Sequence, residues 1–184
     1  IDPHVFIDDD GQAYIYWGNV KMYAAKLNDD MVSVDWSTLA DITPANNYKE
    51  ATFVIKRNGT YYFMWSDGDT GSWNYNVRYG TSSSLLGPIE GNTRILSRNN
   101  TDDPAIRGNA HHSVINIPGT DDWYICYHRF NIPLYGDFEG QASEPGNHRE
   151  VCIDKMTFDD EGNIEVVTAT LEGILEPVII ASPD

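Results

Sequence analysis

The sequence is poor in positive charge and contains no long apolar run. Its 184 residues include 12 lysines and arginines against 28 aspartates and glutamates, which gives a formal net charge of −16. A chain with this balance repels a phosphate backbone, so no nucleic-acid partner is expected. No stretch reaches the roughly 18 consecutive apolar residues of a membrane-spanning helix, so no membrane partner is expected either. A neutral, soluble substrate fits this charge better than an anionic one.

Cysteine is also scarce. Cys126 and Cys152 are the only two, and both lie in apolar, strand-like runs. This setting favours two buried thiols, and a disulfide between adjacent strands is the alternative. The chain begins Ile1-Asp2-Pro3, without an initiator methionine or a signal-peptide pattern, which suggests a start inside a domain. The sequence therefore does not decide between a secreted and a cytoplasmic protein.

The clearest pattern that is present is a repeated hairpin. Each copy has a β-rich run, a turn that contains glycine, and a second β-rich run. In the first three copies the second run is rich in aromatic residues, and these runs start about 50 to 60 residues apart. The paired runs are 5–7 with 13–17, 53–56 with 60–65, 114–117 with 123–127, and 151–158 with 164–167.

This spacing predicts an all-β fold of the β-propeller type. Each interval has room for further strands, such as 22–27 and 76–81, and four short strands repeated in this way are typical of propeller blades. A β-sandwich is the alternative, but it does not require the repeated hairpin. Residues 1–184 would then form a partial propeller domain of about three blades. Because three blades leave faces and edges open, we expect residues before Ile1, or self-association of copies, to cover them.

Two carboxylates precede the first strands of successive hairpins. Asp2 stands before the run 5–7, and Glu50 stands before the run 53–56. The innermost strands of a propeller line its central axis, so the two side chains are predicted to converge. Converging carboxylates are what glycoside hydrolysis uses, one of them to protonate the leaving oxygen. The alternatives are a turn or cap role for Asp2 and a simple surface charge for Glu50.

Two further polar positions follow the same pattern. His111, with His112 beside it, takes the equivalent position in the third repeat, where a satisfied core histidine is the alternative to a functional one. A single histidine is too few for a zinc site, which takes three or four ligands. Arg149 precedes the run 151–158 and could bind a sugar hydroxyl or hold a carboxylate ionised, with a structural salt bridge as the alternative.

Taken together, these stretches resemble glycoside hydrolase family 43, the five-bladed propeller arabinofuranosidases, xylosidases and arabinanases. The resemblance extends over nearly the whole chain, to about Gly173, and it depends on the order and spacing of the pieces. Ala110 departs from the pattern, since glycine is more usual there. The matching stretches are 1–11 with Tyr14-Ile15-Tyr16-Trp17-Gly18, Glu50-Ala51 with 56–62, His111-His112-Ser113 with 118–124, 127–130, and Arg149-Glu150 through 160–162.

The resemblance implies a role for each candidate residue. Glu50 would be the general acid, and Asp2 would be the aspartate that raises the pKa of the acid and orients it. Arg149 would bind substrate as the active-site arginine. His111 would be the histidine on the central axis, in contact with substrate and linked through water to a structural calcium ion, although the neighbouring His112 could be meant instead. No cofactor is required for the reaction that the resemblance implies.

The resemblance also implies a catalytic base, which this chain does not supply. The family's base is another aspartate in the first blade, and nothing here matches it; Asp67 and Asp69 follow an aromatic strand rather than preceding one. The expected function is an inverting glycosidase that releases α-L-arabinofuranosyl or β-D-xylosyl units from plant cell-wall oligosaccharides or polysaccharides, with its base outside this chain. A catalytically inert carbohydrate-binding propeller fragment is the alternative. The loop 131–147 is expected to help select the substrate.

Overall fold

The computed structural model describes residues 1–72, 74–100, 106–130 and 149–176, which form strands and turns without a helix. In these residues no helix is long and apolar enough to cross a membrane. The strands are β1 (His4–Ile7), β2 (Ala13–Trp17), β3 (Tyr23–Leu27), β4 (Val34–Asp41), β5 (Glu50–Arg57), β6 (Thr60–Asp67), β7 (Asn76–Ser82), β8 (Glu90–Leu96), β9 (Ala110–Asn116), β10 (Trp123–Phe130) and β11 (Arg149–Met156).

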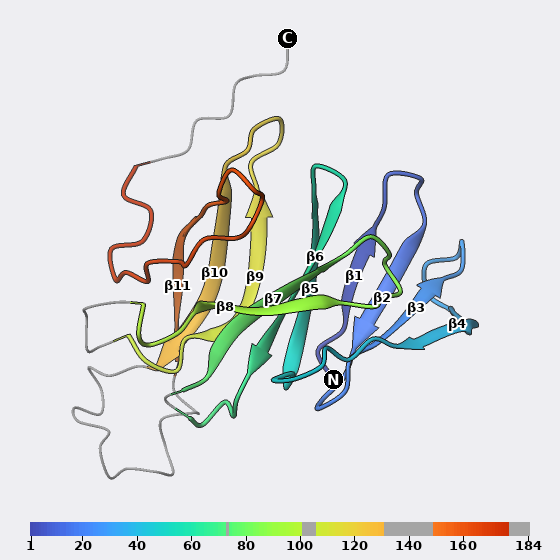
Figure 1. Ribbon diagram of the computed structural model, residues 1–184, viewed down its shortest axis with the longest axis horizontal. Coiled ribbons are helices and arrows are strands. Elements are labelled where there is room, and N and C mark those ends of the chain that lie inside the picture. The colour runs from blue at the N-terminus through green and yellow to red at the C-terminus, as the bar shows by residue number, and fades with distance from the viewer. Residues whose placement is uncertain (73, 101–105, 131–148, 177–184) are drawn as a thin grey trace. The chain divides into compact units, whose positions relative to one another are not determined.

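The strands form three antiparallel sheets (Figure 1). Two of them have four strands in chain order, β1-β2-β3-β4 and β5-β6-β7-β8, and the third has the order β11-β10-β9. This is the all-β, blade-like arrangement that the repeated hairpins predicted. The chain forms two compact units, of which unit 1 is Ile1–Asp69 with Val77–Arg94 and unit 2 is Thr70–Asn76 with Ile95–Asp184.

Aromatic side chains from the two four-stranded sheets build the core of unit 1. Tyr16 on β2 is fully buried, meets Phe63 edge-on at 5.7 Å between ring centroids, and donates its hydroxyl to the carbonyl of Leu85 at 3.1 Å. Trp65 on β6 is also fully buried and donates its indole N–H to the carbonyl of Asn47 at 2.8 Å. The aromatic runs therefore supply apolar area together with the hydrogen bonds that a buried tyrosine or tryptophan needs.

A residue in the left-handed region lies at or just before the start of the first strand of each sheet. Asp2, Ala51 and His111 have φ angles of 53°, 58° and 51°. Each stands two residues before the first regularly paired residue of its strand, namely His4, Phe53 or Ser113. In β5 and β9 the ladder shifts register at this point, as a β-bulge does. The strained backbone position therefore recurs in all three sheets. By this position Asp2 is equivalent to Ala51 and not to Glu50. The sequence analysis had made Asp2 and Glu50 equivalent, so that alignment is wrong by one residue.

The thiols of unit 2 are not joined. Cys126 on β10 pairs with Ile153, and Cys152 on β11 pairs with Tyr127, so the two cysteines are one residue out of register. Because successive side chains of a strand point to opposite faces, the two sulfur atoms lie on opposite faces of the sheet. Both are free, and burial raises the pKa of the Cys152 thiol. The alternative of a cross-strand disulfide is therefore wrong.

The fourth expected hairpin is also wrong in its second half. Residues 164–167 do not form a strand, and Ile164 makes only an isolated bridge to Phe158. The backbone N–H of Val167 bonds instead to the carbonyl of Ile95 at 2.8 Å. The first half exists as β11, whose partner is β10. The turn itself forms, since the backbone N–H of Gly162 donates to the carbonyl of Asp159 at 3.0 Å, but no strand ladder follows it.

Candidate active site

Unit 1 brings the two predicted carboxylates together. Glu50 is the first residue of β5 and is 8% exposed, and Asp2 stands just before β1 and is half-buried. One carboxylate oxygen of each lies within 4.8 Å of the other. The Oδ2 atom of Asp2 is buried, and among the described residues it has no hydrogen-bond partner. The pair was predicted from position alone, and its members do converge.

The separation of the pair restricts its chemistry. Inverting glycosidases hold the acid and the base roughly 6.5–9.5 Å apart, so that a water molecule fits between the base and the sugar. Oxygens within 4.8 Å leave no such space between Asp2 and Glu50. Asp2 therefore fits the part of a neighbour that orients or tunes Glu50, and it does not fit the part of an inverting base.

Two residues that the sequence analysis did not identify surround Glu50. The side-chain amide of Asn19, in the turn after β2, donates to Glu50 Oε2 at 3.0 Å. Tyr48 is buried, and its hydroxyl and that of Thr52 are 3.0 Å apart. The pKa of Tyr48 is raised to about 12, first by burial and then by the charges of Asp2 and Glu50, while the hydrogen bond with Thr52 acts in the opposite direction. Tyr48 is therefore an uncharged phenol beside the acidic pair.

Unit 2 holds the other two predicted residues near one buried histidine. His111 is exposed, its Nδ1 lies 3.4 Å from the Tyr75 hydroxyl, and its ring centroid lies 6.2 Å from that of His128. Tyr75 stacks on His128 at 5.7 Å. The pKa of His128 is lowered to about 3, mainly by burial and then by the charges of Arg149 and His111, against the effect of its hydrogen bond with the Gly108 backbone. His128 is therefore an uncharged imidazole near Arg149 and His111.

Arg149 is the first residue of β11 and is exposed. Its guanidinium donates to the hydroxyl of Thr70. The structural salt bridge of this region belongs to its neighbours, since Arg129 on β10 pairs with Glu150. The structural salt bridge that was the alternative role for Arg149 therefore involves Glu150, the next residue, and Arg129. Arg149 itself lies at the surface of unit 2.

The described contacts of His111 do not form a calcium site by themselves. Calcium takes six to eight oxygen ligands, mostly carboxylates and carbonyls. Within unit 2 the neighbours of His111 include the phenol of Tyr75 and the imidazole of His128. A calcium ion linked to His111 through water therefore remains a prediction.

Two other expectations concern Asp67 and one loop. Asp67, which was not chosen as the base, ends β6 and accepts a hydrogen bond from Arg78 Nε at 2.7 Å. That ion pair joins the carboxylate to a side chain of β7, and the exclusion of Asp67 as the base stays a prediction. The loop 131–147 lies outside the described residues, and its part in substrate selection stays a prediction.

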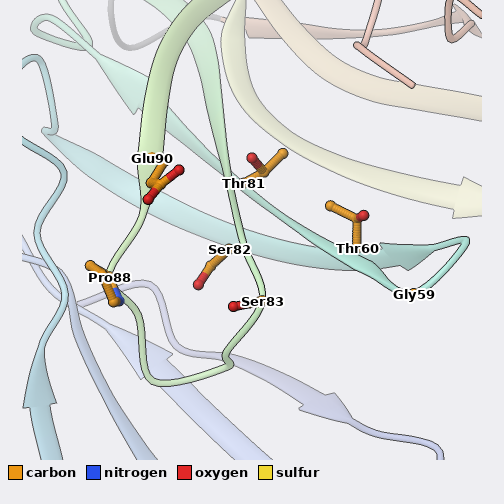
Figure 2. Close-up of a pocket in the computed structure, with 7 residues that line it drawn as sticks. All are labelled: Gly59, Thr60, Thr81, Ser82, Ser83, Pro88 and Glu90. Atoms are coloured by element: carbon orange, nitrogen blue, oxygen red, sulfur yellow. The ribbon is translucent and has the colours of Figure 1, made fainter. Parts of the chain in front are cut away.

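A separate cavity of about 280 Å³ lies at the other end of the second sheet. Figure 2 shows that its lining comes from the β5–β6 turn, the end of β7 and the start of β8. It offers hydroxyl groups and one carboxylate, but no aromatic ring for a sugar to stack on and no paired carboxylates. We therefore do not place the active site there. The lining residues are Gly59, Thr60, Thr81, Ser82, Ser83, Pro88 and Glu90.

Comparison with known proteins finds one family along most of the chain. The model of glycosyl hydrolases family 43 matches residues 1–164. The chain is 34% identical over 175 residues to a β-D-galactofuranosidase of Aspergillus niger, covering 95% of this chain and 47% of that protein. It is 30% identical over 198 residues to an arabinoxylan arabinofuranohydrolase of Bacillus subtilis, covering 95% of this chain and 36% of that protein.

A solved structure is similar as well. A protein described as a glycoside hydrolase superposes with a TM-score of 0.79 at 30% identity, covering 99% of this chain and 38% of that one. The sheets described above are therefore blades of a β-propeller, of which this chain supplies a part. The chain spans less than half the length of these two curated relatives.

Proposed function

Because the chain belongs to glycosyl hydrolases family 43, we propose that it carries the acid half of an inverting glycosidase. The enzyme would remove α-L-arabinofuranosyl or β-D-xylosyl units from plant cell-wall polysaccharides. The observation that supports this most directly is the buried Glu50 beside Asp2, with a carboxylate oxygen of each within 4.8 Å of the other. Paired carboxylates in a partly dry site are the machinery that glycoside hydrolysis uses.

In the proposed reaction Glu50 is the general acid. Its proton passes to the glycosidic oxygen as the bond between that oxygen and the anomeric carbon breaks. A water oxygen forms the new bond from the opposite face of the sugar, and the water proton passes to a base. Asp2 keeps the carboxyl group of Glu50 oriented. The base is assigned to a carboxylate outside these 184 residues, supplied by a further segment or by another copy of the chain.

Arg149 and His111 are proposed to bind the sugar. Both are exposed side chains of unit 2 that offer hydrogen-bond donors. Arginine can donate to sugar hydroxyls through several N–H groups of fixed geometry. The neutral His128 beside them keeps this surface free of an additional buried charge. No cofactor takes part, and the water-linked calcium ion would be structural.

The two curated relatives described above support a furanose as the substrate sugar. The Aspergillus niger relative is named for galactofuranose, and the Bacillus subtilis relative is named for arabinofuranose on arabinoxylan. Both names refer to five-membered sugar rings. We therefore rank α-L-arabinofuranosyl units before β-D-xylosyl units, and β-D-galactofuranosyl units belong in the same test.

The first sheet supports the proposed self-association of the isolated chain. On one face of this sheet Val5, Ile7 and Trp36 are 43%, 56% and 65% exposed. Val5 pairs with Ile15, and Trp17 lies two residues further along the same strand, so these side chains share one face. Trp17 also meets Trp36 edge-on at 6.2 Å between ring centroids. A blade face of this kind is normally covered, and a second copy can cover it when the chain is alone.

The test is hydrolysis of three p-nitrophenyl glycosides, the α-L-arabinofuranoside, the β-D-xyloside and the β-D-galactofuranoside. On an arabino-oligosaccharide, whose leaving alkoxide needs a proton, Glu50→Gln should lower the rate by at least about 100-fold, because it removes the proton donor and keeps the shape. On the p-nitrophenyl glycosides the loss should be smaller. Glu90→Gln is the matched control, since Glu90 is also the first residue of a strand but lines the separate cavity. An unchanged rate of the Glu50 variant on the oligosaccharide contradicts the assignment of the acid.

Two further readings separate the alternatives. Proton NMR of the first product formed should show the inverted anomer, and a retained anomer would mean that Asp2 acts as a nucleophile at its short distance from Glu50. If a folded chain binds arabino-oligosaccharides in calorimetry and leaves them intact, the inert carbohydrate-binding fragment is the correct description. Release of one named sugar from arabinoxylan, arabinan or xylan then identifies the substrate.

A further inference from the structure

The turn between β2 and β3 forms hydrogen bonds with the backbone next to both carboxylates, Asp2 and Glu50. The backbone N–H of Gly18 donates to the carbonyl of Ile1 at 3.0 Å, directly before Asp2. The backbone N–H of Val20 donates to the carbonyl of Lys49 at 2.7 Å, directly before Glu50. Between these two anchors Asn19 directs its amide at Glu50 Oε2, 3.0 Å away. One short turn thus holds the backbone on each side of the site and contacts the acid itself.

The conformation of this turn is strained. Val20 is β-branched, yet its φ angle is 67°, in the left-handed region that such residues rarely occupy. Gly18 has a φ angle of 147° and is the only residue type that fits, as a Cβ there would lie 1.8 Å from the carbonyl oxygen of Lys21. Strain of this kind persists only where surrounding bonds enforce it, and it gathers at functional sites. Here the enforced conformation is the one that presents Asn19 to Glu50.

A hydrogen bond from Asn19 distinguishes the two oxygens of Glu50. An oxygen that accepts an N–H bond is the less favourable place for the carboxyl proton, because a protonated oxygen is a weaker acceptor than the carbonyl oxygen of the same group. The proton is therefore held on Oε1, the other oxygen. Proton transfer to a leaving group requires that the proton point at the glycosidic oxygen, and a freely rotating carboxyl group would often present the wrong oxygen.

We propose that Asn19 is a positioning residue that keeps the transferable proton of Glu50 on Oε1 and aimed at the leaving group. The proposal rests on the proposed function, since it requires Glu50 to be the general acid. It adds the turn 18–22, on the neighbouring sheet, to the catalytic apparatus. It also gives a reason for the strain at Val20, which no packing requirement of that exposed side chain explains.

The test compares leaving groups that differ in their need for a proton. A p-nitrophenolate ion leaves readily without protonation, whereas a sugar alkoxide does not. Asn19→Ala and Asn19→Asp should lower kcat on an arabino-oligosaccharide by about 10- to 100-fold and on the p-nitrophenyl arabinofuranoside by less than about 3-fold, with KM nearly constant. A role in stability alone would lower both rates equally. Asn28→Ala is the matched control, since Asn28 bonds to Ser33 in the β3–β4 turn at 2.8 Å and should change neither rate.

The assay uses the 184-residue chain, or, if that chain hydrolyses nothing, the same chain joined to the further segment that supplies the base. Asn19→Asp tests whether Asn19 must donate the hydrogen bond to Glu50, because a carboxylate can accept such a bond but cannot donate it. Wild-type rates on the oligosaccharide in either Asn19 variant, with Glu50→Gln inactive, overturn the proposal and leave the proposed function intact. Full activity of Glu50→Gln on the oligosaccharide, or no hydrolysis by any form, overturns the proposed function itself.

Discussion

A Cβ atom placed on Gly18 would lie 1.8 Å from the carbonyl oxygen of Lys21. The turn after β2 therefore has room for backbone only at this residue. The consequence extends beyond the turn, because its next two residues bond to Glu50 and to the carbonyl of Lys49. A glycine in a turn of the first sheet thus helps to fix a catalytic candidate in the second.

Gly18→Ala should be among the most damaging single substitutions of unit 1. The added methyl meets backbone, which cannot move aside as a flexible side chain can, so we expect a loss of about 3 kcal/mol or more in unfolding free energy. Urea denaturation measures it. Gly11→Ala is the matched control, because Gly11 also has a positive φ, at 85°, but a Cβ there meets nothing within 4 Å. Left-handed strain alone costs about 1–2 kcal/mol, and equal losses in the two variants would contradict the steric argument.

Ala51→Gly should have the opposite effect. Ala51 has a φ angle of 58° in the bulge next to Glu50, and glycine occupies this region without strain. We expect the unfolding free energy to stay constant or to rise by up to about 1 kcal/mol, since relief of strain offsets the added chain entropy and the loss of a buried methyl group.

Ala25→Gly serves as the control for that change. Ala25 is equally buried, lies in the regular ladder of β3 opposite Ile15, and has no positive φ. There glycine should cost about 1 kcal/mol or more, from chain entropy and the lost methyl group. A loss of the same size in both variants, measured by urea denaturation, would show that the bulge at Ala51 holds no strain.

Much of the fold could be predicted from the sequence because its signals are local. Aromatic runs such as 13–17 and 60–65 follow turns that contain glycine, and each became the second strand of its sheet. The failure at 164–167 has the same origin. Its turn forms as the local signal predicted, but no ladder follows the bridge at Ile164, and Val167 bonds to Ile95, a residue that no local pattern connects with it.

The candidate site was predictable only in part. Asp2 and Glu50 could be found because both stand at or just before the start of the first strand of successive sheets. Asn19 could not, since its contact with Glu50 joins residues 31 positions apart, and the sequence around it shows only a glycine-containing turn. Tyr48 and His128 were missed for a similar reason, because burial and nearby charges, not residue type, give them their unusual pKa values.

Trp36→Ser should weaken self-association of the 184-residue chain. Trp36 is 65% exposed next to Trp17, on the face of the first sheet that also bears Val5 and Ile7. Loss of a large exposed aromatic group should lower the affinity between copies by about 10-fold or more. Sedimentation at several concentrations measures it. Val32→Ser is the control, since Val32 is 86% exposed in the β3–β4 turn, and a monomeric wild type would remove the basis of the prediction.

His128 should make unit 2 sensitive to acid. Its pKa lies near 3 in the folded protein, against an ordinary value of 6.5. The unfolded chain therefore binds the additional proton between these values, so the stabilisation is complete above pH 6.5 and is lost as the pH falls towards 3. Between pH 7 and pH 4 the loss from this residue is about 3 kcal/mol.

His128→Gln should remove most of that acid sensitivity. The amide can still donate to the Gly108 backbone but cannot titrate, so the unfolding free energy of the variant should fall less between pH 7 and pH 4 than that of the wild type. Urea denaturation at the two pH values measures the difference, and the values at pH 7 show any cost of the substitution itself. Parallel losses in both proteins would mean that His128 is solvated and protonated in the folded state. Its ring would then carry a positive charge near Arg149 and His111, and the assignment of His128 as an uncharged side chain would be wrong.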